Sequence, residues 1–416
     1  MKSALFDGNF RIVAPNPFVR CTLHAHDGKP LAQGHTQPRG HAHAEVMALR
    51  DAAAKGISVK GATAYVSLEP CSHFGRTSPC CHALIEAGIA KVVIAILDPN
   101  PLVAGRGVQM LRDAGIEVEV LPTDSAEAIA SRELNIGFFS RMIRKTPWVR
   151  IKIAASLDGQ TALTNGASQW ITGAAARSDG HAWRARACAV LTGIGTVLQD
   201  DPLLDVRHVA TPRQPHLVIV DSQMDTPLTA KLWSTLGKSS IKTGDSKTAG
   251  NTAGNTTLIR AGHVYEATST VKELDFGLNA DVLASIPGRS IIIYASVHNA
   301  AKQKALEALG ATVVVLPEAN SQKVDLRAMM FDLGQREINE LHVEAGFKLN
   351  GSLVKAGVVD ELLVYTAPKL LGPGMGMANT PALAALAEAV QLQFKSADMV
   401  GEDLRIVARV QGRDQF

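Results

Sequence analysis

Residues 41–82 of this chain read HAHAEVMALRDAAAKGISVKGATAYVSLEPCSHFGRTSPCCH and contain three of its five cysteines. His43 and Glu45 open a segment with helical spacing of apolar residues, and Cys71 and Cys80 follow further along. One imidazole and two thiolates suit Zn²⁺, and three protein ligands leave the fourth tetrahedral position to water. Such an open site is typical of catalysis, because the ion lowers the pKa of its water and creates a hydroxide nucleophile. Glu45 would then carry a proton from that water to a leaving group.

The same residues also allow a closed structural zinc site or a set of buried core thiols. Closure needs a fourth ligand, which Cys81, His41, His73 or His82 could supply. The order of the residues favours the catalytic interpretation: His-Ala-Glu begins one expected helix, a β-rich run ends in Glu-Pro-Cys, and Pro-Cys begins another helix. Zinc deaminases of nucleobases share this H-x-E…P-C order, although two residues separate their cysteines, not the eight found here.

The long separation has a parallel in a known family. Residues 70–80 resemble the P-C-S-H-x-G-[RK]-T-P-P-C segment of the bifunctional riboflavin-biosynthesis deaminase–reductase family, with Ser78 in place of the first proline of the pair. Residues 15–21 are similar to the family's P-N-P-x-V-G-C, with Arg20 where glycine is expected, and the resemblance continues through residues 98–107. It implies an N-terminal α/β domain with a cytidine-deaminase-like three-layer fold.

The resemblance also implies roles for individual residues. The zinc ligands would be His43, Cys71 and Cys80, with Glu45 as the proton shuttle. The positions that hold the pyrimidine and its phosphoribosyl arm are matched by Asn16, His35, His73 and Arg76. The implied first reaction is hydrolytic deamination of 2,5-diamino-6-(5-phosphoribosylamino)pyrimidin-4(3H)-one.

Length and composition limit the class of protein. At 416 residues the chain exceeds one typical core, so two or three domains are expected. A net charge of +3 and 5% aromatic residues argue against a nucleic-acid partner. An odd number of clustered cysteines, with no signal peptide and no apolar run long enough for a membrane, predicts a cytoplasmic protein without disulfides.

Helical and β-like segments alternate along the chain, which predicts α/β sheets. Residues 18–33 are expected to form a hairpin around Asp27-Gly28, and residues 125–145 a single connecting helix. The pattern restarts after Pro147, so we expect a deaminase domain at 1–145 and a second domain at 146–416. A Ser/Thr/Gly-rich stretch, 234–257, is expected to be a long mobile loop.

The second half lacks the G-x-G-x-x-G dinucleotide fingerprint. Its K-x-x-x-S-x-D-G-x-x-A at 152–162, S-x-W-I-T at 168–172, T-V-L-x-D-D-P at 196–202 and V-E-A-G at 343–346 resemble the reductase half of the same family. That resemblance implies a dihydrofolate-reductase-like α/β fold and NADPH as cofactor. The implied reaction reduces the ribosyl arm to a ribityl arm, giving 5-amino-6-(5-phosphoribitylamino)uracil.

Residue roles in this half are also implied by the resemblance. The NADPH positions are matched by Ala154, Trp170, Thr196, Asp200, Ser222 and a turn from Gly346 to Gly351-Ser352, where a helix is expected to open. The substrate positions are matched by Ser168, Arg184, Leu204, Arg207 and Glu344. Lys152, Asp200 or Glu344 would open the sugar or relay its proton, and two arginines suit a phosphate monoester.

Two other interpretations stay open at this point. One is a nucleoside or nucleic-acid zinc deaminase with an accessory C-terminal half, and the other is a non-enzymatic binding protein stabilised by zinc. We expect a homo-oligomer, a dimer or a tetramer, that acts on a small molecule.

Overall fold

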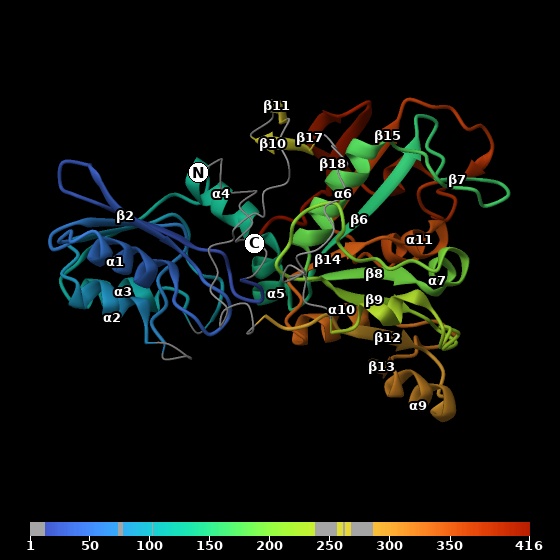
Figure 1. Ribbon diagram of the computed structural model, residues 1–416, viewed down its shortest axis with the longest axis horizontal. Coiled ribbons are helices and arrows are strands. Elements are labelled where there is room, and N and C mark those ends of the chain that lie inside the picture. Colours follow the sequence, from blue (N-terminus) through green and yellow to red (C-terminus); the bar gives the residue numbers. More distant parts are fainter. Residues whose placement is uncertain (1–12, 74–77, 102, 238–255, 261–262, 268–285) are drawn as a thin grey trace, which may run out of the picture. The chain divides into compact units, whose positions relative to one another are not determined.

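The chain forms two compact units, and it passes from one to the other between Arg144 and Lys145. The structure is a computed structural model, which describes residues 13–73, 78–101, 103–237, 256–260, 263–267 and 286–416 (Figure 1). Each unit is built on its own sheet. Within the described residues, no helix has the length and apolarity needed to cross a membrane.

The N-terminal unit is a five-stranded mixed sheet in the order β2-β1-β3-β4-β5. β1 pairs antiparallel with β2 and with β3, whereas β3, β4 and β5 are parallel. The hairpin expected around Asp27-Gly28 is present, and Gly28 takes the left-handed conformation that such a turn requires (φ 83°). In chain order the elements are β1 (Arg20–His24), β2 (Pro30–His35), α1 (Ala44–Ala54), β3 (Thr63–Val66), α2 (Cys80–Glu86), β4 (Lys91–Ile94), α3 (Arg106–Asp113) and β5 (Glu117–Val120).

The single connecting helix expected at 125–145 is wrong, because the structure has two helices, α4 (Ala126–Leu134) and α5 (Ile136–Arg144). They meet at Asn135, whose side chain is buried. Its Oδ1 accepts a hydrogen bond from the Phe18 backbone N–H at 2.8 Å, and its Nδ2 donates to the Phe18 carbonyl at 3.0 Å. A side chain that pairs with both backbone groups of a distant residue explains why the helix is interrupted there.

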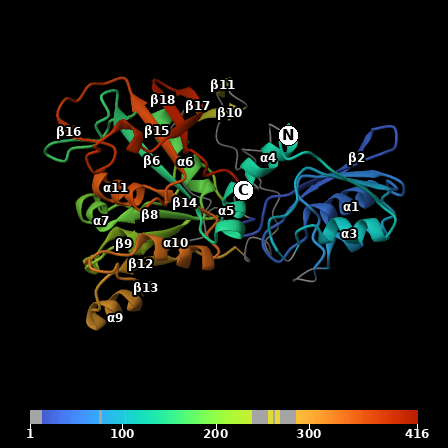
Figure 2. The same ribbon diagram turned by 180° about the vertical axis from the view of Figure 1, so that it is seen from behind.

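The C-terminal unit has a nine-stranded sheet in the order β13-β12-β9-β8-β14-β6-β15-β18-β17 (Figure 2). Each pair of neighbouring strands from β13 to β15 is parallel. β18 is antiparallel to both of its neighbours, β15 and β17. Its strands are β6 (Trp148–Ser156), β8 (Ala189–Gly193), β9 (His216–Val220), β12 (Ile291–Ala295), β13 (Ala311–Val315), β14 (Glu340–Val343), β15 (Glu361–Ala367), β17 (Leu392–Val400) and β18 (Asp403–Val410).

Helices connect these strands, as parallel pairing demands. They are α6 (Ala174–Arg186), α7 (Ile194–Asp200), α9 (Ala300–Ala308), α10 (Leu326–Gln335) and α11 (Phe347–Lys355). Short elements complete the chain: β7 (Ala162–Leu163), η3 (Lys231–Thr235), β10 (Thr256–Arg260), β11 (His263–Ala267), β16 (Gly374–Met375) and η4 (Leu386–Glu388). The expectation that a helix opens at Gly351-Ser352 is wrong, because α11 already begins at Phe347. Most of the stretch expected to be a mobile loop, 238–255, lies outside the described residues.

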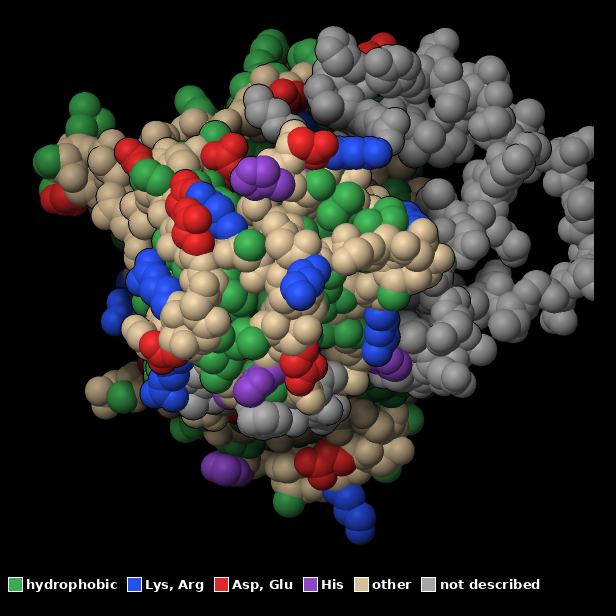
Figure 3. Space-filling model, turned by 90° about the vertical axis from the view of Figure 1, so that its left-hand side faces the viewer, with side chains coloured by type: hydrophobic (Ala, Val, Ile, Leu, Met, Phe, Trp, Pro, Cys, Tyr) green, Lys and Arg blue, Asp and Glu red, His purple; other side chains and the backbone are tan. Residues whose placement is uncertain are grey.

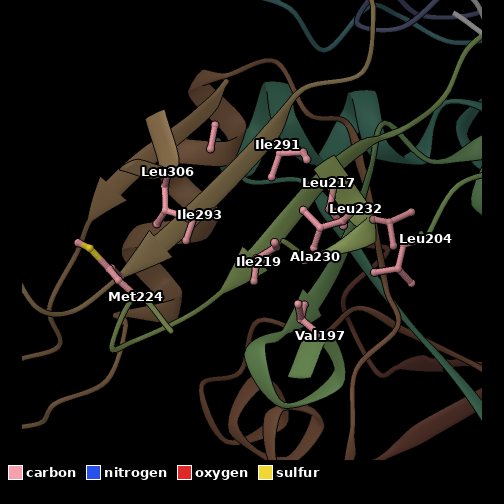
Figure 4. Packing of buried hydrophobic residues seen from close by; sticks show 13 residues of the cluster. Val197, Leu204, Leu217, Ile219, Met224, Ala230, Leu232, Ile291, Ile293 and Leu306 are labelled. Atoms are coloured by element: carbon pink, nitrogen blue, oxygen red, sulfur yellow. The ribbon is translucent and has the colours of Figure 1, made fainter. Parts of the chain in front are cut away.

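Buried aliphatic residues form the core on one face of the large sheet at its β13 end (Figure 4). Leu217 and Ile219 of β9 pack there with Ile291 and Ile293 of β12, and Leu306 of α9 covers them. β-Branched and leucine side chains on adjacent parallel strands are typical of a sheet covered by helices. This core fixes the strand ends that carry the second candidate site.

Candidate functional sites

Two helix starts bring three metal-ligating side chains together in the N-terminal unit. His43 is the N-cap of α1, Cys80 is the first residue of α2, and Cys71 lies on the loop that follows β3. The His43 Nδ1 lies 3.3 Å from the Cys80 Sγ and 3.5 Å from the Cys71 Sγ. All three ligand atoms lie within 4.8 Å of one another. Atoms of this type at this spacing fit one tetrahedral ion such as Zn²⁺.

The surroundings of Cys71 stabilise a negative charge on its sulfur. Hydrogen bonds from the Cys80 thiol and His43 to the Cys71 sulfur lower the pKa of Cys71 to about 4, against the burial that would raise it. The Cys80 backbone N–H also donates to this sulfur at 3.3 Å. These contacts favour the thiolate form of Cys71, which is the form that binds metal ions. The donor set fits zinc without any rearrangement of the backbone.

Glu45 lies in the first turn of α1 and is 2% exposed. Burial and the neighbouring Cys71 raise the pKa of its carboxyl group to about 7. A carboxyl group beside the sulfur ligands whose pKa lies near neutrality can both accept and donate a proton, as a general acid–base needs. The residue does not belong to the ligand cluster, in keeping with a role in proton transfer.

The closed zinc site is not what the structure shows. Within the described part of the chain, the ligand cluster contains only the three residues above. Cys81, which follows Cys80, is buried, and its thiol donates to the carbonyls of Pro70 (3.4 Å) and Gly107 (3.6 Å). Among the described residues, none completes the set, and three protein ligands with an open fourth position are the arrangement of catalytic zinc sites.

Glu69 organises the loop opposite the cluster, a role that the sequence interpretation missed. Its buried carboxylate accepts backbone N–H groups from Gly105 (2.9 Å), Gly107 (2.9 Å), Val108 (3.2 Å) and Asp98 (3.3 Å). A Cβ on Gly107 would lie 2.2 Å from the Pro70 carbonyl oxygen, so only glycine fits there. The available signal was its place in Glu69-Pro70-Cys71, two residues before a candidate zinc ligand.

The residues predicted to hold the pyrimidine and its arm lie on separate segments of the N-terminal unit. Asn16 lies in a turn before β1, and His35 ends β2 and stacks on Phe18 with ring centroids 6.0 Å apart. His73 is exposed two residues after Cys71. Arg76 lies outside the described residues.

A second site forms where neighbouring parallel strands of the large sheet end. Thr196 and Asp200 on α7 follow β8, Ser222 follows β9, and Gly346 follows β14. These strands are adjacent, so the four residues share the carboxyl edge of the sheet, where α/β proteins bind ligands. The N-termini of α7 and α11 begin there, and neither has a side-chain cap. Uncapped helix N-termini suit the phosphates of a dinucleotide such as NADPH.

Three charged side chains converge beside this edge. Arg184 of α6 donates to both oxygens of Glu344, at 2.6 and 2.8 Å. Burial alone would raise the pKa of Glu344, but Arg184 holds it well below its usual range. Burial, with a smaller contribution from Arg184, lowers the pKa of Lys152, although Glu344 acts the other way. A buried lysine with a lowered pKa is suited to passing a proton.

The remaining predicted residues differ in their surroundings. Ala154 lies on β6, and Ser168 lies in the segment before Trp170, which is 66% exposed with the Arg177 guanidinium 4.6 Å from its ring. Leu204 is buried in the aliphatic core, and Arg207 is paired with Asp205. Gly351 and Ser352 contact the protein itself: a Cβ on Gly351 would lie 2.1 Å from the Asn379 carbonyl oxygen, and Ser352 donates to Lys348.

Comparison with known proteins finds a family model for each of the two units. Residues 11–96 match the family model of the cytidine and deoxycytidylate deaminase zinc-binding region, and residues 147–264 and 267–406 match that of the RibD C-terminal domain. The riboflavin biosynthesis protein RibD of Escherichia coli is 39% identical over 392 residues, which cover 94% of this chain and 92% of that protein. The Haemophilus influenzae protein of the same name is 38% identical, over 96% of this chain and 92% of its own length.

Solved structures give the same result. Acinetobacter baumannii RibD superposes with a TM-score of 0.75 at 33% identity, over 98% of this chain and 96% of that one. A Thermotoga maritima structure, described as a diaminohydroxyphosphoribosylaminopyrimidine deaminase/5-amino-6-(5-phosphoribosylamino)uracil reductase, gives 0.71 at 26% identity, over 97% and 95% of the two chains. The likeness extends over both units.

The fold and its sites define a two-domain enzyme that joins a zinc-dependent deaminase to an α/β reductase. The chain belongs to the RibD family of riboflavin biosynthesis proteins. The expected fold class is confirmed, and so is the bifunctional activity with Zn²⁺ and NADPH as cofactors. An accessory C-terminal half is not favoured, because that half matches the RibD C-terminal domain.

Proposed function

We propose that residues 1–145 deaminate 2,5-diamino-6-(5-phosphoribosylamino)pyrimidin-4(3H)-one and that residues 146–416 reduce the ribosyl arm of the product with NADPH. The observation that carries the first half is the three-ligand cluster with a buried carboxyl group beside it. The second half is supported by the match to the RibD C-terminal domain and by the buried charged group of Arg184, Glu344 and Lys152.

In the deaminase site, His43, Cys71 and Cys80 would hold the zinc ion, which lowers the pKa of water and so supplies a nucleophile at neutral pH. Glu45 accepts the proton that the attacking water releases and returns it to the departing amine. Its burial keeps the carboxyl group close to the balance between its two forms. Asn16, His35, His73 and Arg76 orient the ring and its phosphorylated arm.

In the reductase site, Ala154, Trp170, Thr196, Asp200, Ser222 and the start of α11 hold NADPH. Ser168, Arg184, Leu204, Arg207 and Glu344 hold the substrate arm. Lys152 gives a proton to the sugar ring oxygen as the ring opens, because its lowered pKa makes that transfer easier. Asp200, at the exposed end of α7, is the alternative relay, and burial raises the pKa of its carboxyl group.

The direct test supplies purified, zinc-loaded protein with the diamino substrate and follows the product by mass spectrometry. Without NADPH, we expect exchange of one amino group for oxygen and nothing more. Addition of NADPH should then add a hydride and a proton, with matching loss of nicotinamide absorbance. No deamination, or deamination without later reduction, would contradict the corresponding half of the proposal.

The protein also acts as a homo-oligomer that associates through β17. This strand ends the nine-stranded sheet, and it exposes Phe394 (73%) and Met399 (60%). An edge strand that exposes large apolar side chains can pair with another chain. Phe394→Asp should give monomers in light scattering, whereas Phe331→Asp on α10, also exposed, should not. Unchanged mass for Phe394→Asp would contradict this interface.

The place of action is the cytoplasm. All five cysteines are free thiols, and a site built on thiolates needs a reducing compartment to persist. Active enzyme in the cytoplasmic fraction of cells, with none in the surrounding medium, would support this assignment.

A further inference from the structure

One row of paired residues across the large sheet changes from apolar to charged at a single histidine. From the β13 end, directly paired positions carry aliphatic side chains as far as Val190 of β8. Val190 pairs with His342 of β14, and His342 pairs with Arg150 of β6. Arg150 begins a buried charged group that continues through Glu361. His342 therefore lies between the aliphatic core and the charged side chains.

The imidazole of His342 is fully buried, and neither ring nitrogen has a hydrogen-bond partner among the residues that the structure describes. Burial lowers its pKa to about 3, and Arg150, Arg184 and Lys152 act in the same direction, against Glu344. These are the charged groups that face it from β6, α6 and the end of β14. The ring is thus neutral and carries one N–H group.

A buried polar group without a partner is costly, so its position calls for a reason. The Nε2 of His342 lies 3.5 Å from the Glu344 Oε1, beyond the length of a good hydrogen bond. In this structure Arg184 occupies both oxygens of that carboxylate. The imidazole is adjacent to Glu344 but not yet bonded to it.

Arg184 and Glu344 are both assigned to the reductase substrate, yet they bind each other here. A substrate phosphate or hydroxyl that engages Arg184 must weaken this pair. The freed carboxylate would remain buried, where an unpaired charge is unstable and takes up a proton. Lys152 also favours the ionised form of Glu344, but through charge alone. A second hydrogen-bond donor would take the place that Arg184 leaves.

We propose that His342 is that donor: a positioning residue whose Nε2–H bonds to Glu344 when the substrate draws Arg184 away. The inference rests on the proposed reductase function and extends it. The backbone of Glu344 is already fixed, because its N–H donates to the Leu191 carbonyl and its carbonyl accepts from Thr192, both at 2.8 Å. From the present 3.5 Å, the carboxylate needs to approach the imidazole by only about 0.5 Å to make a good hydrogen bond.

Two substitutions test this. His342→Leu removes the donor, and His342→Gln keeps an N–H group near the place of Nε2. The reductase kcat of the leucine variant should fall by on the order of tenfold, which corresponds to the contribution of a hydrogen bond to a charged group. The acid limb of its pH profile should move to higher pH, because Glu344 would take up a proton more easily. The glutamine variant should recover most of both. Denaturant unfolding of each variant checks that the C-terminal unit is folded, and deaminase activity checks the N-terminal unit.

A leucine variant with the wild-type pH profile, or a glutamine variant as impaired as the leucine variant, would overturn the inference. Nitrogen-15 NMR of the wild-type protein gives an independent measurement, in which His342→Gln assigns the signal. We expect a neutral ring protonated on Nε2, and protonation on Nδ1 would overturn the inference. If the wild-type protein fails to oxidise NADPH on the deaminated substrate, the proposed reductase function is wrong. The tautomer of the His342 ring still shows whether its Nε2–H can bond to Glu344.

Discussion

The three candidate zinc ligands all come from one continuous stretch, His43 to Cys80, whereas the charged residues of the reductase site come from β6, α6 and the end of β14. The zinc cluster is set by helix starts: His43 is at the N-cap position of α1 and Cys80 begins α2. The reductase cluster instead depends on the register of β14 against β6 and on the packing of α6.

The two regions therefore differ in what can disturb them. A change in the zinc cluster acts through the metal and leaves the large sheet intact. In the reductase cluster, the same face of the sheet carries both site residues and buried ion pairs that stabilise the fold. Function and stability are separable in the first region and linked in the second, and the following predictions test that contrast.

The largest effect is expected from loss of the metal. Cys71→Ser removes the thiolate, so bound zinc should be lost and deaminase activity should fall by on the order of a hundredfold or more. Reduction of the deaminated substrate should continue at the wild-type rate. Cys81→Ser is the matched control, because that thiol bonds to two carbonyls outside the cluster. Zinc analysis and separate assays of the two steps measure the outcome.

Glu45→Gln should keep the zinc and abolish proton transfer. We expect deaminase kcat to fall by about 10²–10⁴-fold, which is the usual contribution of a general acid–base to the rate. Glu86→Gln, an exposed change on α2, should have no effect. Full activity of the Glu45 variant would show that another group moves the proton.

Lys152→Met should lower reductase kcat by on the order of a hundredfold and leave deamination unchanged, because the methionine keeps the apolar stem and lacks the proton donor. Lys304→Met, on the exposed part of α9, is the control. Stopped-flow loss of NADPH absorbance under saturating substrate measures the step. Full reductase activity of the Lys152 variant would contradict its role as proton donor and would favour Asp200 instead.

The smallest effect on activity, and the clearest on stability, concerns Glu340. Burial would raise its pKa, but Arg186 and Arg150 lower it to about 2. A carboxyl group whose pKa is depressed in the folded protein stabilises the fold at pH values above its unfolded-state pKa. That contribution is lost as the pH falls toward 2. Glu340→Gln should therefore cost about 3 kcal/mol of unfolding free energy at pH 7 and much less near pH 3.

Denaturant unfolding at both pH values measures that difference, with the exposed Glu402→Gln as control. Deaminase activity should survive. A loss for the Glu340 variant that is equal at both pH values would contradict the ion-pair account.

The contrast also explains what the sequence could predict. His43, Glu45, Cys71 and Cys80 lie at helix starts and strand ends that local patterns define, so the site was predictable as a unit. The pairing of Arg184 with Glu344, and the place of His342 between them and the core, depend on strand order, which no local pattern contains. The same limit applies to Asn135, where a contact with Phe18 interrupts a helix that the periodicity alone would continue.

The central claim is an open zinc site with one imidazole, two thiolates and a position for water. X-ray absorption spectroscopy of the zinc-loaded protein tests it most directly. We expect two sulfur atoms at about 2.3 Å and two nitrogen or oxygen atoms at about 2.0–2.1 Å, one of them from an imidazole. A third sulfur or a second imidazole around the metal would contradict the claim, because it would leave no position for the attacking water.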